Sequence, residues 1–199
     1  MLEKINFDDY QERDDKTWND PLADEFIRQL SSDNVNLLRE WAGSSFQFNE
    51  PARAGKTTPK IEQLVKIIDS SEVPDHVRMF RVTSPSTLDV YRMKGKLFNE
   101  GEIIKMDGFT SASATKKAIN ETRDSFKNAG RNVNVEIELF VPKGTKAIPL
   151  SKASRDLKYE FQKEWLFQRD TEVQVLEKRF QNGRVILKLL VLNRQEETK

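Results

Sequence analysis

Residues 132–141 read N-V-N-V-E-I-E-L-F-V and carry the clearest strand signal of the sequence. Successive side chains of a strand point to opposite faces, so an apolar residue at every second position predicts a strand with one buried face. The apolar positions are Val133, Val135, Ile137, Leu139 and Val141. We therefore expect a sheet around this strand, and we look for its partners on either side.

Further strand patterns flank this stretch. Asn182 and Gly183 form the dipeptide that favours a tight hairpin turn, so the two segments beside it are predicted to pair. A helix with few large apolar residues is expected at 114–128. The predicted strands are 77–82, 101–106, 147–150, 164–167, 172–180 and 184–192.

The first 72 residues look helical instead. Apolar side chains recur at helical spacing over 18–30 and 32–43, and again from Pro59 onwards, while 44–58 reads as a polar passage. Helices first and strands afterwards indicate an α+β fold with an antiparallel or mixed sheet. We expect one domain, 1–199, made of a flexible arm (1–16), a helical part (17–72) and a β-rich core (73–199).

Composition excludes several classes of function. The 199 residues include 33 basic and 32 acidic side chains, and a net charge of +1 does not favour nucleic acid as a partner. There is no cysteine and only one histidine, His76, so a thiol nucleophile or a Cys/His metal cluster is not expected. The start of the sequence lacks an apolar signal segment, and no segment is long enough to span a bilayer. We expect a cytoplasmic monomer that needs no metal.

Three polar features stand at predicted strand ends: Arg81 between Phe80 and Val82, the serines of F-T-S-A-S at 109–113, and Gln162-x-Glu164 before an apolar run. Each has an ordinary structural explanation. The arginine suits an edge salt bridge, the serines suit a cap on the next helix, and the carboxylate suits a solvated strand. Alternation nevertheless places Ser111 on the same side as Ser113, which capping alone does not require.

In this order the three features resemble the R-S-E group of mono-ADP-ribosyltransferases. Two further segments are similar to that family: W-A-G-S-S-F at 41–46, and V-P-K-G-T-K at 141–146, directly after the central strand. The resemblance runs from about Trp41 to Leu176. It implies two facing, mostly antiparallel sheets that hold NAD+ in a cleft without a G-x-G-x-x-G loop, and none is present.

The resemblance also implies roles for single residues. Arg81 would grip the phosphate or ribose part of NAD+, and Ser111 would hold Glu164, which would bind the ribose next to nicotinamide. Gln162 would position the target side chain. Further contacts with NAD+ are implied for Ser113, Arg123, Phe126, Trp41 and Phe46.

Two positions depart from the family pattern. Ala112 replaces a common threonine, and Gln162 stands where a glutamate usually accompanies arginine as the acceptor. Glutamine at that position is similar to the clostridial Rho-modifying exoenzymes, whose acceptor is asparagine. The acceptor, arginine or asparagine, therefore stays open.

The implied activity is NAD+-dependent mono-ADP-ribosylation of a host target protein by a phage protein or bacterial effector acting in the host cytoplasm. Two alternatives remain at this point. One is an NAD+ glycohydrolase, which would use the same Arg81, Ser111 and Glu164 with water as acceptor. The other is a catalytically silent relative that serves as a binding or structural protein.

Overall fold

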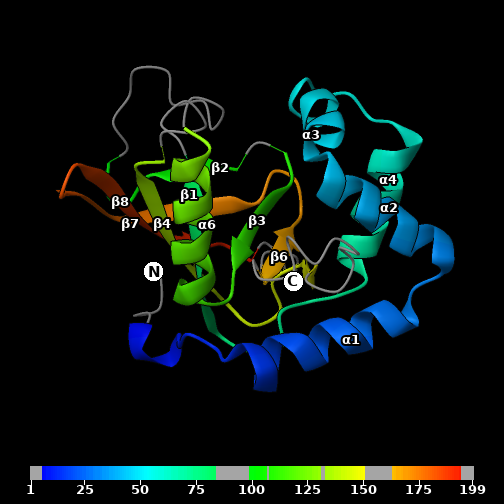
Figure 1. Ribbon diagram of the computed structural model, residues 1–199, viewed down its shortest axis with the longest axis horizontal. Helices are drawn as coiled ribbons and strands as arrows, with labels where there is room; N and C mark the ends of the chain where they lie inside the picture. Colours follow the sequence, from blue (N-terminus) through cyan, green and yellow to red (C-terminus); the bar gives the residue numbers. More distant parts are fainter. Residues whose placement is uncertain (1–5, 84–98, 107, 131–132, 151–162, 194–199) are drawn as a thin grey trace, which may run out of the picture.

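The computed structural model describes residues 6–83, 99–106, 108–130, 133–150 and 163–193. Four helices precede the first strand, and α6 is inserted between β3 and β4 (Figure 1). The predicted α+β class is confirmed. The helices are α1 (Asp20–Gln29), α2 (Ser32–Gly43), α3 (Ser45–Arg53), α4 (Pro59–Asp69) and α6 (Lys116–Asn128), with short helical turns η1 (Phe7–Asp9) and η2 (Asp15–Asn19).

Most helices begin where the sequence predicts. Pro21 lies in the first turn of α1, where its missing N–H costs no helical hydrogen bond. Ser31 caps α2, because its side chain accepts a hydrogen bond from the backbone N–H of Asn34. Thr58 caps α4 in the same way, directly before Pro59.

Helix α3 lies where the sequence predicts a polar passage, so that expectation is wrong. Pro51 stands inside this helix and removes one N–H donor from it. Two side chains on the preceding turn offset this loss: Phe48 is 2% exposed in the helical core, and Asn49 is buried as well. Packing of these two residues outweighs the weak local helix signal.

Within the described residues, eight strands form a single hydrogen-bonded sheet in the order β2-β7-β8-β4-β1-β3-β6-β5. Neighbouring strands run antiparallel except β4 and β8, which are parallel. The bounds are β1 (Val77–Thr83), β2 (Ile103–Lys105), β3 (Thr110–Ser113), β4 (Val135–Val141), β5 (Ala147–Pro149), β6 (Glu164–Phe167), β7 (Glu172–Gln181) and β8 (Arg184–Val191). The prediction had not assigned β3 to a strand.

The sheet consists of two halves that meet at one residue pair. Phe80 of β1 lies opposite Ser113 of β3, and no other register pair joins these two strands in the described part of the chain. The halves face each other across the main hydrophobic core, as predicted for two facing sheets. This core combines Met79, Ile137 and Leu189 from the larger half with Ala112, Trp165 and Phe167 from the smaller half.

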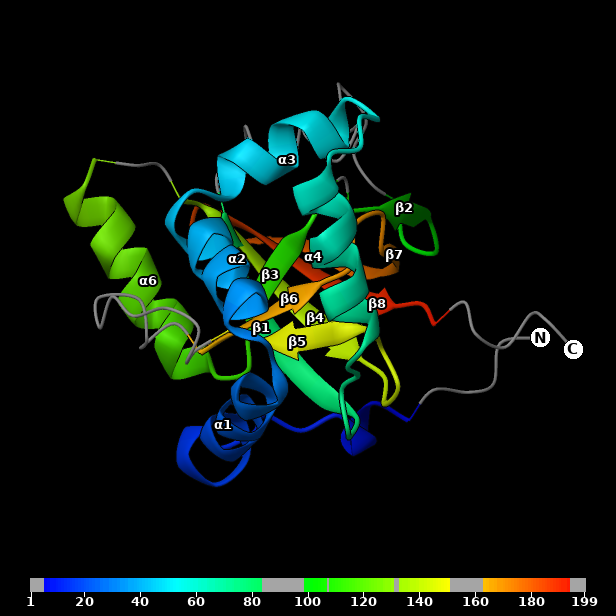
Figure 2. The same cartoon turned by 90° about the vertical axis from the view of Figure 1, so that its right-hand side faces the viewer.

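Helices cover the outer surfaces of both halves. Figure 2 shows α2 and α4 in front of β3, β6 and β5, and their apolar residues share a second core with Ile148 and Leu166 of these strands. Helix α6 covers β1, where Ile119 packs against Phe80 and Val82. Ala112 of β3 lies in the main core, and Phe109, directly before this strand, lies in the helical core. All four residues of β3 are buried.

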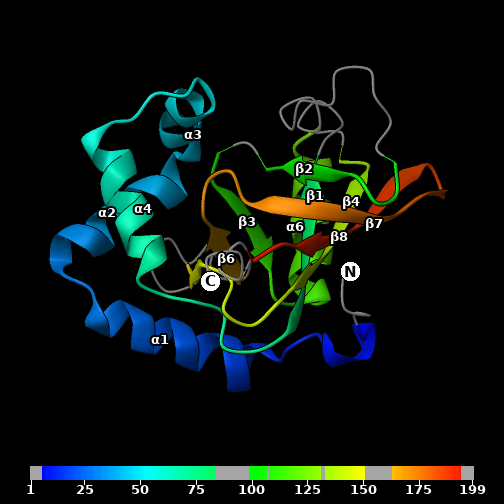
Figure 3. The same ribbon diagram turned by 180° about the vertical axis from the view of Figure 1, so that it is seen from behind.

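The hairpin of β7 and β8 extends from one side of the molecule (Figure 3). Its turn residues Asn182 and Gly183 both have positive φ, 52° and 73°, as the primed hairpin turn requires. The predicted tight turn is confirmed.

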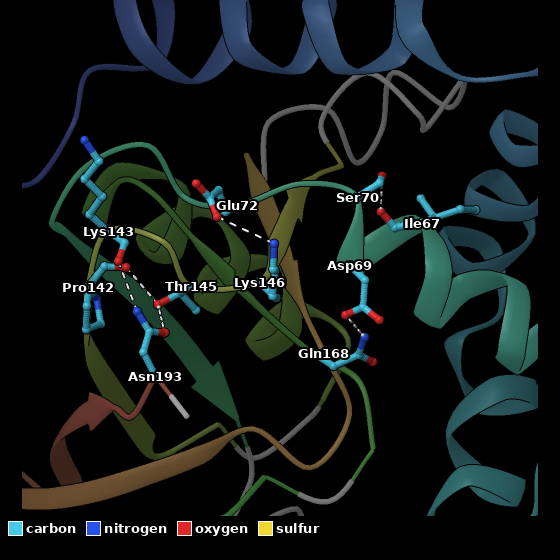
Figure 4. Close-up of polar contacts among 10 residues, drawn as sticks. All are labelled: Ile67, Asp69, Ser70, Glu72, Pro142, Lys143, Thr145, Lys146, Gln168 and Asn193. Carbon is cyan, nitrogen blue, oxygen red and sulfur yellow. Dashed lines mark hydrogen bonds and ion pairs between the residues drawn. The ribbon is translucent and has the colours of Figure 1, made fainter. Parts of the chain in front are cut away.

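The V-P-K-G-T turn joins β4 to β5 and is fixed from two directions. Val73 exchanges backbone hydrogen bonds with the turn, donating to Thr145 O and accepting from Gly144 N. Asn193, which follows β8, donates to Lys143 O at 3.0 Å and accepts from Thr145 Oγ1 at 2.9 Å (Figure 4). The segment after α4 and the residues after β8 thus meet at this turn.

The described part of the N-terminal arm is packed against the sheet. Tyr10 is 8% exposed and contacts Phe140 and His76 by its ring, and Gln11 forms a parallel bridge with Val77. None of the helices within the described ranges has the length and apolar character needed to cross a membrane.

Candidate active site

Three of the predicted site residues come from three adjacent strands. Arg81 lies in β1, Ser111 in β3 and Glu164 in β6. Strand β3 stands between the other two in the sheet, so it brings both of their functional side chains within reach of its own serine. The three residues are 30 and 53 positions apart in sequence.

A chain of hydrogen bonds connects these side chains. Arg81 Nη1 donates to the Ser111 carbonyl at 2.5 Å and to Ser111 Oγ at 3.3 Å. The Ser111 hydroxyl then donates to Glu164 Oε1 at 3.0 Å. One hydroxyl thus accepts from a cation and donates to a carboxylate, which fixes both the hydrogen atom and the direction of the carboxylate.

The electrostatics of Glu164 follow from this position. Burial raises the pKa of its carboxyl above the ordinary value, while the hydrogen bond from Ser111 and the positive charge of Arg81 lower it. Burial is the largest of these effects, so the net direction is upward. An ionised Glu164 is therefore poorly hydrated, and it interacts strongly with any positive charge that develops next to it.

Ser113 lies directly opposite Glu164 in the pairing of β3 with β6, and opposite Phe80 in the pairing of β3 with β1. It is 3% exposed. The serines are predicted to cap the next helix, but Thr115 is the residue that caps α6, by accepting from Ala118 N. Neither Ser111 nor Ser113 is therefore the cap of α6.

Asn49 is a site-shaping residue that sequence reasoning missed. Its side chain donates to Phe109 O at 3.1 Å and accepts from Phe109 N at 2.8 Å, two residues before Ser111. Gly108 next to it has φ +76°, and a Cβ there would lie 2.7 Å from Asn49 Oδ1. The Asn49 amide therefore pairs with the backbone N–H and C=O of Phe109, as a neighbouring strand would, and fixes the start of β3. No pattern around residue 49 marks this contact, which spans 60 positions of sequence.

Two predicted NAD+ contacts, Arg123 and Phe126, lie on α6. Arg123 is 8% exposed and is bound to Glu136 of β4 at 2.7 Å and to Asn120 at 2.9 Å. Arg81 lies opposite Ile137, the next residue of β4, so Arg81 and Glu136 belong to opposite faces of that strand pair. The structure thus does not bring Arg123 together with Arg81. Phe126 follows on the same helix and is half-buried.

Two further predicted contacts are aromatic and lie in the helical part. Trp41 is 4% exposed in the core formed by α2, α3 and α4, and its Nε1 has no hydrogen-bond partner within the described residues. Phe46 on α3 is 64% exposed. Gln162, the remaining predicted catalytic residue, lies outside the described residues.

The chemistry of the described residues fits NAD+ as a substrate. A guanidinium is the side chain best suited to phosphate oxygens, and the buried Nε of Arg81 has no partner among the described residues. A carboxylate fixed by a hydroxyl suits a ribose hydroxyl group and a developing cation beside it. Within the described ranges, no group of three or more His, Cys, Asp or Glu side chains is arranged to hold a metal ion.

Comparison with known proteins gives the family. The ADP-ribosyltransferase exoenzyme family matches residues 15–194 of this chain. No curated protein sequence matches it significantly.

Solved structures of similar fold are ADP-ribosyltransferase toxins and exoenzymes. The chain is 21% identical to C3stau2 from S. aureus, solved with NAD, with a TM-score of 0.71 over 94% of this chain and 100% of that one. It is 21% identical to Plx2a, an ADP-ribosyltransferase toxin from Paenibacillus larvae, with a TM-score of 0.70 over 89% and 94%. It is 20% identical to the C3 exoenzyme of Clostridium limosum, with a TM-score of 0.68 over 88% of this chain and 92% of that one. The family match, which spans most of the chain, shows that this protein belongs to the ADP-ribosyltransferase exoenzyme family.

Proposed function

We propose that this protein cleaves NAD+ at the bond between nicotinamide and ribose and transfers ADP-ribose to a side chain of a host target protein. The observation that carries the proposal is the hydrogen-bonded chain from Arg81 through Ser111 to Glu164. It joins a cation suited to phosphate with a braced carboxylate suited to the ribose. The family of the chain and the NAD in the C3stau2 structure support NAD+ as the substrate.

Each residue has a defined task in this reaction. Arg81 binds the negatively charged part of NAD+, and Glu164 accepts a hydrogen bond from a hydroxyl of the ribose that carries nicotinamide. As the C1′–N bond breaks, its electron pair leaves with neutral nicotinamide, and the ribose becomes positively charged. Glu164 stabilises this charge, and because Ser111 already holds it, little reorganisation is needed. The acceptor then attacks C1′ and loses a proton.

We further propose that the acceptor is the side chain of an asparagine or an arginine, with Gln162 next to it. The support is the spacing Gln162-x-Glu164, which sets the two residues two positions apart in sequence. An amide at this position pairs with another amide, whereas a glutamate would attract a guanidinium. We also propose that the protein acts as a monomer in the host cytoplasm.

Labelled NAD+ incubated with host lysate tests the proposal. We expect a labelled protein band with the wild type and none with Glu164→Ala, which should also lose nicotinamide release. Free ADP-ribose without a labelled band would indicate a glycohydrolase instead. The variant Gln162→Ala should keep hydrolysis and lose transfer, and mass spectrometry of the labelled protein identifies the acceptor.

A further inference from the structure

The beginning of α1 contacts both residues that flank Glu164. Lys163 Nζ lies 2.7 Å from Asp20 Oδ1, and Trp165 Nε1 donates to Asn19 Oδ1 at 2.7 Å. Asn19 and Asp20 are consecutive, and so each of them holds one neighbour of the carboxylate. Figures 1 and 2 both show α1 below the sheet.

These contacts are buried rather than superficial. Asn19 and Trp165 are 0% and 1% exposed, and the Lys163 and Asp20 side chains are 14% and 25% exposed. Trp18 stacks on Trp165 with ring centroids 5.2 Å apart. An ion pair with this little solvent around it is screened much less than a surface pair, and loss of one partner is strongly destabilising.

Asn19 uses its side chain in an unusual way for its position. It is the residue before the first turn of α1, where an asparagine side chain ordinarily accepts from a helix N–H. No such capping bond forms here: Asn19 has a helical backbone, φ −70° and ψ −47°, that continues from η2 into α1, and its amide oxygen accepts from Trp165 Nε1. The helix start is thus oriented toward β6.

The backbone conformation of Lys163 explains why the contacts of Asn19 and Asp20 with the residues beside Glu164 matter. Lys163 has φ +46°, a left-handed conformation that costs a residue with a Cβ about 1–2 kcal/mol. The Lys163 carbonyl accepts from Ala114 N, and the next residue is Glu164. A relaxation of Lys163 to an ordinary conformation would redirect the chain directly before the carboxylate. Such strained residues persist only where their surroundings hold them.

We propose that Asn19, Asp20 and Lys163 are positioning residues that hold the Glu164 carboxylate against Ser111. Glu164 and Trp165 point to opposite sides of β6. The start of α1 therefore contacts the side that carries Trp165, while the carboxylate of Glu164 faces Ser111 on the other side. The ion pair holds Lys163 in its left-handed conformation, and the hydrogen bond from the indole fixes Trp165, the residue after Glu164 in β6. This proposal rests on the proposed function, because its main readout is the cleavage of NAD+.

The test compares nicotinamide release by the wild type, Lys163→Met, Asp20→Asn and the double variant, without any target protein. For each single variant we expect a loss in kcat on the order of tenfold to a hundredfold, as for a slightly misplaced catalytic group, with KM within about twofold. The double variant should have a kcat no lower than that of the poorer single variant, since each substitution breaks the same ion pair between Lys163 and Asp20. Lys163→Arg keeps the charge and should recover most of the turnover.

Lys188→Met is the matched control. It removes a lysine that also lies 2.7 Å from a carboxylate, Glu177, but on the β7–β8 hairpin. Its kcat should equal that of the wild type. The positioning role is overturned if folded Lys163→Met and Asp20→Asn retain wild-type kcat, or if only their KM changes.

A second measurement does not need activity. The carboxyl carbon of Glu164 is followed by NMR during a pH titration of the wild type and Lys163→Met. Loss of a nearby positive charge alone would raise the pKa of Glu164, whereas release of the carboxyl into water would lower it toward the ordinary value. We expect a decrease. The decrease is expected because the carboxylate loses its burial, the largest effect on its pKa, together with the Ser111 bond. An unchanged pKa contradicts the positioning role, while absence of nicotinamide release by the wild type contradicts the proposed function alone.

Discussion

Ser111 donates its hydrogen bond to Glu164 diagonally across two strands. In the register of β3 and β6, the residue opposite Glu164 is Ser113, and the residue opposite Ser111 is Leu166. Diagonal neighbours are about 7–8 Å apart at the backbone, within reach of a long side chain but not of two short ones. Glutamate is long enough to lean toward Ser111, and the 3.0 Å bond shows that it does.

The first prediction concerns this bond. Ser111→Ala removes the donor and leaves the Glu164 carboxylate buried with one partner fewer. Because the serine lowers the pKa of Glu164, its loss raises that pKa further. We expect kcat for nicotinamide release to fall about tenfold to a hundredfold. This is slightly less than the usual effect of removing one oriented hydrogen-bond donor that contacts the transition state. The acidic limb of the pH–rate profile should move to higher pH, and an unmoved limb would contradict the bond.

The second prediction separates charge from shape. Glu164→Gln keeps the size of the side chain and removes its negative charge. Nicotinamide release should fall by about a hundredfold or more, because the charge that forms on the ribose loses its stabilising partner. Calorimetry should show that NAD+ still binds through Arg81. Glu177→Gln on the β7–β8 hairpin changes a carboxylate in the same way and serves as the control.

The third prediction links the same carboxylate to stability. The pKa of Glu164 is higher in the folded protein than the ordinary value near 4.3 of an unfolded chain, because burial disfavours the charged form. The folded state therefore binds its proton more tightly. The resulting stability is complete below the unfolded pKa and is lost as the pH rises through the folded pKa.

At neutral pH the wild type consequently carries an unfavourable buried charge that Glu164→Gln lacks. Thermal unfolding should give the variant a Tm equal to or above that of the wild type at pH 7.5. The advantage should shrink as the pH falls through the folded pKa to below the ordinary value. A wild type that is clearly more stable at pH 7.5 would refute this account.

The fourth prediction concerns Gly108. Its φ is +76° and a new Cβ would meet Asn49 Oδ1 at 2.7 Å, so Gly108→Ala pushes away the amide that pairs with Phe109. Loss of such buried hydrogen bonds costs about 1–3 kcal/mol beyond the left-handed backbone penalty of about 1–2 kcal/mol. Urea unfolding and kcat should both report the change.

Gly55→Ala is the matched control for Gly108→Ala. Gly55 has φ +71°, and a Cβ there meets nothing within 4 Å. This variant should therefore show the backbone penalty alone, with unchanged kcat. If the two alanine variants unfold at the same urea concentration, the contact with Asn49 contributes nothing.

Much of the fold follows from local sequence. The alternation around Ile137, the turn at Asn182 and Gly183, and the helix starts near Pro21 and Pro59 are encoded by neighbouring residues, and the structure agrees with them. Such features need only the period of the apolar residues and the backbone preferences of proline and glycine.

Helix α3 and strand β3 were not predicted, for a common reason. Helix α3 contains Pro51, and β3 consists of small residues, so neither has a strong local preference. Both are stabilised by contacts with distant segments, as the pairing of Asn49 with Phe109 illustrates. The order of the site motifs was visible in the sequence. The diagonal register, the clamp from α1 and the placement of Arg123 beside Glu136 depend on tertiary packing, which no local pattern encodes.

The junction of Phe80 with Ser113 has a mechanical consequence. Phe80 directly precedes Arg81, and Ser113 lies opposite Glu164, so the joint between the two half-sheets lies next to the functional side chains. A small rotation of one half-sheet against the other about this pair would change the distance between the Arg81 guanidinium and the Glu164 carboxylate. The single register pair that joins the two half-sheets in the described part of the chain therefore lies beside the functional side chains.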